Sequence, residues 1–198
     1  LSGICEGARR RMTEFTQALA RRPVIASVRE ESAMALAAES SVAAIFILGG
    51  SIFSLPDMIR MAHDRGKYAF LHMDLAEGLG RDDAAVEWCA RVLKLDGLIS
   101  TRPQPLRRAS ELGMITIQRL FLMDSPSFEH GKRLLRNTPP DMAEVLPGIA
   151  PKAVRQLCAA LDKPVIAGGM ISEKSEILDA LQAGALAVSV SDSRLWNL

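Results

Sequence analysis

The 198-residue sequence is poor in cysteine and has no long apolar run. Its cysteines, Cys5, Cys89 and Cys158, are far apart and form no Cys-x-x-Cys pair, which argues against a disulfide framework or a metal site. We expect them to be buried free thiols of a cytoplasmic protein. The longest apolar stretch, Val42–Leu48, is too short to span a bilayer, so we expect no membrane partner.

Aromatic residues and net charge are also scarce. Aromatics make up 5% of the chain, so a base-stacking platform of the kind that binds single-stranded nucleic acid is not evident. The formal net charge is +1, which argues against a generally basic, non-specific nucleic-acid binder. A local basic face remains compatible with this balance.

What the sequence does contain is an alternation of short β-type runs and longer amphipathic helical segments. The β-type runs are nearly continuous in Val, Ile, Leu and Phe, as is typical of strands buried on both faces. They are Pro23–Val28, Ala43–Leu48, Tyr68–Asp74, Gly97–Thr101, Met114–Phe121, Asp141–Pro147, Pro164–Gly168 and Ala185–Ser191.

Eight strands that alternate with helices predict a parallel sheet closed into a (β/α)₈ TIM-type barrel. Such barrels usually need ~250 residues, so we expect a compact one with short loops and a last helix of little more than a turn. Residues 1–22 form an extra N-terminal helical extension and residues 23–198 form the barrel, within one domain over 1–198.

Glycines and serines follow the last two predicted strands. Gly168 and Gly169 end one run, and Ser189 and Ser191 lie at the end of the next. In many barrels these two loops bind a phosphate through backbone N–H groups, and glycine lets the backbone approach the anion closely. The sequence predicts a phosphate site here. Alternatively, the glycines form only a tight turn, and Ser191 or Ser193 only caps the final helix.

Two further sets of polar residues lie in or at the end of predicted strands. His72 and Asp74 share one face of a strand and could form an acid–base pair, or a polar pair that binds ligand hydroxyls. Gln118 and Arg119 interrupt an apolar strand, so one should face inward and the other toward the helices. A buried arginine needs a partner. Glu144 could form a structural ion pair with Arg119, or Arg119 could contact a ligand.

Positive charge is concentrated in residues 102–136, which hold seven basic and three acidic residues. The two helices that begin near Pro103 and Ser125 are neighbours in a barrel, and their basic residues could form one surface. These residues are Arg107, Arg108, Lys132, Arg133 and Arg136. Such a surface suits a polyanion such as RNA. Alternatively, it is a solvated helix face with local ion pairs.

Several motifs occur in the order in which one known family has them. They are Pro23–Val28, His72–Leu79, Asp96–Thr101, Thr116–Ser125, Glu144–Ile149, Pro164–Gly169 and Ala183–Ser189, with a late Leu195-Trp196. Over residues 22–197 the set resembles the glycerol-3-phosphate-responsive antiterminator family, whose members regulate glycerol uptake operons.

The resemblance implies a (β/α)₈ barrel that binds glycerol 3-phosphate as its effector, with no cofactor, and that binds leader mRNA to prevent premature transcription termination. The ligand-binding residues that it implies are Asp74, Glu77, Thr101, Gln118, Arg119, Glu144, Gly148, Gly168, Gly169, Ser189 and Ser191. We therefore expect a regulator without catalytic residues, which could also form a homo-oligomer. The alternative is a barrel enzyme for a phosphate ligand, such as an isomerase or a glycerol-phosphate transferase, and the His72/Asp74 pair keeps it open.

Overall fold

The structure is a computed structural model that describes residues 2–198, with side chains from residue 7 onward. The strands are β1 (Val24–Val28), β2 (Ala44–Ile47), β3 (Tyr68–His72), β4 (Gly97–Ser100), β5 (Ile115–Phe121), β6 (Met142–Leu146), β7 (Val165–Gly168) and β8 (Ala187–Val190). The α-helices are α1 (Ser2–Arg21), α2 (Met34–Glu39), α3 (Leu55–Asp64), α4 (Asp83–Arg91), α5 (Pro103–Glu111), α6 (Ser125–Asn137), α7 (Pro151–Ala160) and α8 (Lys174–Gln182). Short 3₁₀ turns are η1 (Glu31–Ala33), η2 (Met73–Leu75) and η3 (Ser193–Leu195).

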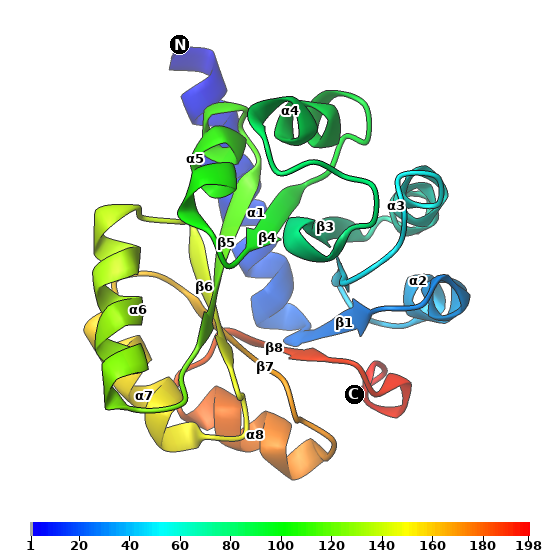
Figure 1. Ribbon diagram of the computed structural model, residues 1–198. Helices are drawn as coiled ribbons and strands as arrows, with labels where there is room; N and C mark the ends of the chain where they lie inside the picture. Colours follow the sequence, from blue (N-terminus) through cyan, green and yellow to red (C-terminus); the bar gives the residue numbers. More distant parts are fainter. Residues whose placement is uncertain (1) are drawn as a thin grey trace.

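The strands form a closed parallel barrel in chain order, with β1 paired to both β2 and β8 (Figure 1). Helices α2 to α8 surround it, so the predicted TIM-type (β/α)₈ fold is confirmed. The eight predicted runs match β1 to β8 within two residues at each end. One boundary differs for a structural reason: β3 ends at His72 rather than Asp74, because the chain turns there into η2.

The apolar residues form two separate cores. One lies between the strands and the surrounding helices, and the other fills the barrel itself. Phe46 and Phe70 meet inside the barrel, with ring centroids 5.4 Å apart, and Ile117 and Ile166 are buried beside them. This packing fills the lower part of the barrel with side chains, so polar groups are confined to the carboxyl ends of the strands.

The predicted N-terminal helical extension is α1, and it closes the amino-terminal end of the barrel. Phe15 and Leu19 on α1 are fully buried and belong to the interior core. The Phe15 ring centroid lies 4.8 Å from that of Phe70 and 5.0 Å from that of Tyr68. Figure 1 shows α1 crossing behind the strands. The opposite end of the barrel is left for a site.

The two cysteines with described side chains are free thiols. Cys89 is buried, as predicted, and burial raises the pKa of its thiol to about 12. Cys158 is only half-buried, and the side chain of Cys5 lies outside the described residues. Among the described residues, no helix is both long enough and apolar enough to cross a membrane.

The α1 contact leads to a stability prediction. Phe15→Ala should lower the free energy of unfolding by about 3–5 kcal/mol, because it leaves a cavity against Phe70. Gln17→Ala, at an exposed position of the same helix, is the control and should change it by less than about 0.5 kcal/mol. Urea unfolding followed by circular dichroism measures both. Equal effects of the two variants would show that α1 adds nothing to the interior core.

Candidate functional site

Buried polar side chains gather at the carboxyl ends of the strands, above the apolar interior. Five of them share this level: Ser27 on β1, His72 on β3, Arg119 on β5, Glu144 on β6 and Ser189 on β8. Each lies two residues after a member of the interior core and therefore also faces into the barrel, because side chains alternate along a strand. The barrel therefore carries one polar layer at the end where proteins of this fold place their sites.

Glu144 is the centre of one half of this layer. Its carboxylate is fully buried and accepts a hydrogen bond of 2.7 Å from Arg119 Nε and another of 2.7 Å from Ser189 Oγ. The predicted ion pair between Arg119 and Glu144 is thus confirmed. Gly168 leaves room for it, since a Cβ there would lie 2.2 Å from Ser189 Oγ. Within residues 2–198 the Nη groups of Arg119 make no hydrogen bond, so they are available to a ligand.

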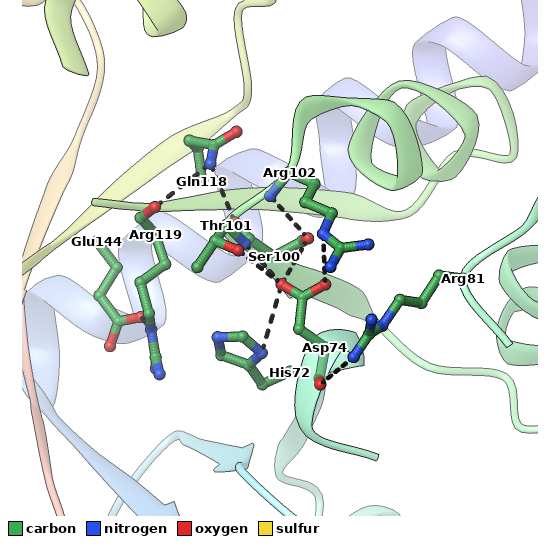
Figure 2. A network of polar contacts seen from close by, with 9 residues as sticks. All are labelled: His72, Asp74, Arg81, Ser100, Thr101, Arg102, Gln118, Arg119 and Glu144. Carbon is green, nitrogen blue, oxygen red and sulfur yellow. Dashed lines mark hydrogen bonds and ion pairs between the residues drawn. The ribbon is translucent and has the colours of Figure 1, made fainter. Parts of the chain in front are cut away.

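Asp74 is the centre of the other half, shown in Figure 2. Its Oδ2 accepts hydrogen bonds from Ser100 Oγ (2.9 Å), the Thr101 backbone N–H (2.8 Å) and Thr101 Oγ1 (3.0 Å). Burial opposes ionisation of this carboxyl, but these three donors outweigh it, and the pKa of Asp74 lies below its ordinary value. Asp74 is therefore a carboxylate at neutral pH.

His72 lies between the two halves, with its ring between Asp74 and Arg119 in Figure 2. Its side chain is 3% exposed, and Nδ1 is 4.0 Å from Asp74 Oδ2. Burial lowers the pKa of His72 to about 4, and the Arg119 guanidinium adds to this effect, while Asp74 opposes it. His72 is therefore neutral at pH 7, which does not suit a general acid.

The neutral, buried imidazole should make folding sensitive to acid. In the unfolded chain a histidine takes up a proton near pH 6.5, whereas folded His72 stays neutral down to about pH 4. Between these values the unfolded state binds the extra proton. The free energy of unfolding should therefore fall as the pH falls through this window, by up to about 3 kcal/mol. Urea unfolding at about pH 7 and about pH 4.5 should show a smaller fall for His72→Gln than for the wild type. Equal falls would contradict the prediction.

The loops after β7 and β8 complete the cavity wall. Gly169 (φ 80°) and Met170 (φ 64°) are both left-handed, and within residues 2–198 their backbone N–H groups donate to no protein acceptor. Gly148 supports this turn from below, since its N–H donates to the carbonyl of Gly168 (2.6 Å). The cap of η3 is Asp192 rather than a serine. Hydrogen bonds from the side chain and backbone N–H of Arg194 lower the pKa of Asp192 to about 2.

A cavity of about 80 Å³ opens between these groups. Its lining residues are Ser27, Arg29, Leu48, Arg119, Glu144, Leu146, Gly169, Met170, Ile171, Ser189 and Ser191. Larger hollows lie on the outer surface, about 610 Å³ between α1 and the start of β5 and about 590 Å³ between α6 and α7, and no buried charged side chain lines either one. The small polar cavity is therefore the candidate site.

Nine of the eleven predicted ligand-binding residues fall into three groups. Five line the cavity: Arg119, Glu144, Gly169, Ser189 and Ser191. Gly148 and Gly168 lie beneath it, and Asp74 and Thr101 form the neighbouring carboxylate cluster. The other two stand apart.

Gln118 faces the helices, where its Nε2 donates to the carbonyl of Ser100 (3.1 Å). Glu77 is exposed on the loop after η2, which pairs with the loop after β2 through Ser51. Ser27 and Arg29 were not among the predicted ligand contacts, and His72 was predicted only as a partner of Asp74 in an acid–base or hydroxyl-binding pair. The position of Arg29 and His72 at strand ends was the available signal for these two.

The predicted basic surface is partly neutralised. Arg108 pairs with Glu111 (2.9 Å), and Lys132 pairs with Glu129 (2.7 Å). Arg107, Arg133 and Arg136 are exposed and form no ion pair with the side chains of residues 7–198. Local ion pairs thus hold two of the five cations, as the second interpretation predicts, and the binding of a polyanion by this surface stays a prediction.

The closed barrel defines a TIM-barrel protein, and the polar cavity at its carboxyl end is its candidate site. A family model described as "Glycerol-3-phosphate responsive antiterminator" matches residues 24–196. The chain belongs to the glycerol-3-phosphate-responsive antiterminator family, as its motifs predicted.

Similar proteins agree with this assignment. The chain is 33% identical over 180 residues to the Escherichia coli (strain K12) protein "Uncharacterized protein YgcP", covering 91% of this chain and 94% of that one. A crystal structure of a glycerol uptake operon antiterminator regulatory protein from Listeria monocytogenes has a TM-score of 0.85 and 33% identity, over 88% and 95% of the two chains. An antiterminator-related protein from Thermotoga maritima gives 0.78 and 28%, over 88% and 98%.

Proposed function

We propose that this protein is a transcription antiterminator of a glycerol uptake operon that binds leader mRNA under the control of glycerol 3-phosphate. The effector binds in the cavity at the C-terminal face of the barrel. Family membership supports the regulatory role. The main support for the binding site is the Arg119 guanidinium. It donates a hydrogen bond to Glu144 through Nε alone, so both Nη groups are available to an anion.

The phosphate group binds between Arg119 and the turn at Gly169. The free N–H groups of Gly169 and Met170 supply backbone donors, and Ser191 adds a hydroxyl at the cavity edge. Arg29, at the end of β1, brings a second guanidinium to the lining. Such a concentration of donors suits a phosphate monoester better than an uncharged polyol.

Gly169→Val tests the phosphate site. A valine there would be strained at φ 80°, and its Cβ would lie 3.0 Å from Leu146 Cδ2, so the turn should move away from the anion. Titration calorimetry should show at least about tenfold weaker binding of glycerol 3-phosphate, since one or more hydrogen bonds to a charged group are lost. The wild type should bind glycerol 3-phosphate more tightly than glycerol.

Gly66→Val is the matched control. Gly66 is also left-handed (φ 65°), but no atom lies within 4 Å of its Cβ position, and it precedes β3 at the other end of the barrel. Valine at this position causes similar backbone strain, so the Gly66→Val variant should lose stability without losing affinity for glycerol 3-phosphate. Equal wild-type affinity for glycerol and glycerol 3-phosphate would refute the phosphate site. So would a folded Gly169→Val variant that binds normally.

The RNA surface is formed by α5 and α6 on the outside of the barrel. Its free cations are Arg107, Arg133 and Arg136, and phosphate contacts supply much of the affinity of most RNA-binding surfaces. Effector and RNA then occupy different sites, and any coupling between them is a linkage free energy, typically ~1–3 kcal/mol.

Strand β5 is the connection between the two sites. Arg119 faces the cavity, and the next residue, Leu120, packs outward against α6, where a Cβ on Gly131 would lie 3.2 Å from Leu120 Cδ1. A movement of Arg119 on effector binding would therefore reach the helix that carries Arg133. The loop after β4, which holds Arg102 next to Asp74, is a second route.

Reversing the free cations tests the RNA surface. The triple variant Arg107→Glu, Arg133→Glu, Arg136→Glu should lose leader-RNA binding and keep its affinity for glycerol 3-phosphate. Any remaining binding should show a shallower salt dependence, because each lost phosphate contact lowers the slope by about one unit. Filter binding at several salt concentrations measures this.

A double variant on α3 and the residue that follows it is the control for reversed charge. Arg60 and Arg65 are exposed but already paired with Asp57 and Glu39, so reversing both to Glu should affect RNA binding little. Parental binding and salt slope in the triple variant would place the RNA interface elsewhere, and Arg9, Arg10 and Arg11 on α1 would be examined next.

The alternative function is an enzyme that acts on a phosphate ligand. Family membership favours the regulator over it. The cavity lining supports the same choice, because it contains no lysine for an imine and no cysteine nucleophile among the described residues. His72 is neutral and does not hydrogen-bond Asp74, so an oriented acid–base pair is also lacking in this part of the chain.

A further inference from the structure

One buried acceptor atom next to the cavity lacks a hydrogen-bond donor. Asp74 uses Oδ2 for all three of its protein donors, whereas Oδ1 is buried and accepts no hydrogen bond from residues 2–198. Arg102 Nε, the nearest cationic group, is 3.9 Å from Oδ1. A buried carboxylate oxygen that accepts no hydrogen bond costs about 1–3 kcal/mol, so a ligand that donates a hydrogen bond to it gains affinity.

His72 supplies the second acceptor. Its Nδ1 faces the Asp74 carboxylate at 4.0 Å, so the proton of the neutral ring is best placed on Nδ1, where the negative charge attracts it. The other ring nitrogen, Nε2, then carries a lone pair. It makes no hydrogen bond to any described residue. His72 follows the inward-facing Phe70 on β3, so its ring is directed into the barrel.

The opposite side of the site has the complementary chemistry. Arg119 offers donors, whereas Asp74 and His72 offer acceptors (Figure 2). The N–H groups of Gly169 and Met170 add donors on the side of Arg119. A bound molecule must therefore carry an anion at one end and hydrogen-bond donors at the other.

We propose that His72 and Asp74 form a two-acceptor subsite that recognises the two neighbouring hydroxyls of a polyol phosphate and rejects a keto or aldehyde phosphate of the same size. This inference rests on the proposed function, because it assigns the second end of the same ligand. A carbonyl oxygen in place of a hydroxyl would set an acceptor against an acceptor. It would leave the protein oxygen unpaired, which is how sites built for a hydroxyl reject its analogues.

Calorimetry with two ligands tests the proposal. Glycerol 3-phosphate has a hydroxyl at C2, and dihydroxyacetone phosphate has a carbonyl there. The wild type should prefer glycerol 3-phosphate by about tenfold to a hundredfold, the value of one unpaired buried group. Asp74→Asn is the informative variant. Its amide oxygen can keep the donors of Ser100 and Thr101, while its N–H₂ replaces Oδ1 and can donate to a carbonyl.

The Asp74→Asn variant should therefore lose most of the preference and bind the keto phosphate at least as well as the wild type does. His72→Phe keeps a planar ring without the Nε2 acceptor, which serves the C1 hydroxyl that both ligands carry, so it should weaken the binding of both by a similar factor and leave the preference unchanged. It also tests the proposal if Asp74→Asn does not fold. Asp57→Asn, at an exposed carboxylate on α3, is the control and should match the wild type in both affinities.

The outcomes separate the two proposals. If the wild type binds neither phosphate, the proposed function fails. If it binds both equally, if Asp74→Asn keeps the wild-type preference, or if His72→Phe binds both ligands as tightly as the wild type does, the two-acceptor subsite is wrong and the phosphate site stands. Thermal unfolding of each variant shows that a loss of binding does not come from a loss of fold.

Discussion

The buried carboxylate of Glu144 is the constraint on which the site depends. A fully buried charge is tolerated only when it is paired and hydrogen-bonded. Arg119 on β5 and Ser189 on β8 supply those bonds from two different strands, and Gly168 on β7 leaves the space between them. All four residues meet only when the barrel is closed. The same contacts hold the Arg119 guanidinium at the cavity, so closure of the barrel also positions the cation of the candidate site.

The two halves of the polar layer differ in what they offer. The side formed by β5 to β8 presents donors and positive charge, through Arg119 and the N–H groups at Gly169. The side formed by β3 and β4 presents acceptors, through the Asp74 carboxylate and a neutral His72. This polarity matches the proposed effector, which has an anionic end and a hydroxyl end.

The ends of the barrel are divided between stability and function. Helix α1 closes the amino-terminal end with Phe15 and Leu19, so that the interior core is complete without any polar group. The carboxyl end is then free to carry the charged layer, and β5 joins that layer to α6 on the outside. An effector site and a basic surface on one chain can thus be linked through one strand without overlapping.

The sequence by itself determined the architecture. Eight apolar runs that alternate with amphipathic helices specify a parallel barrel, because the periodicity of burial is written locally in each segment. It also predicted that Arg119, a charged residue inside an apolar strand, requires a partner, and it offered Glu144 or a ligand for this role.

Only the tertiary structure decided which polar groups meet. Gln118 and Arg119 are neighbours, and the direction of β5 sends one to the helices and the other to the cavity. The early turn after His72 brings Asp74 under Ser100 and Thr101, and the unpaired state of Asp74 Oδ1 follows from that geometry. These contacts join residues at least 18 positions apart, so they depend on strand register and barrel closure, which no local pattern encodes.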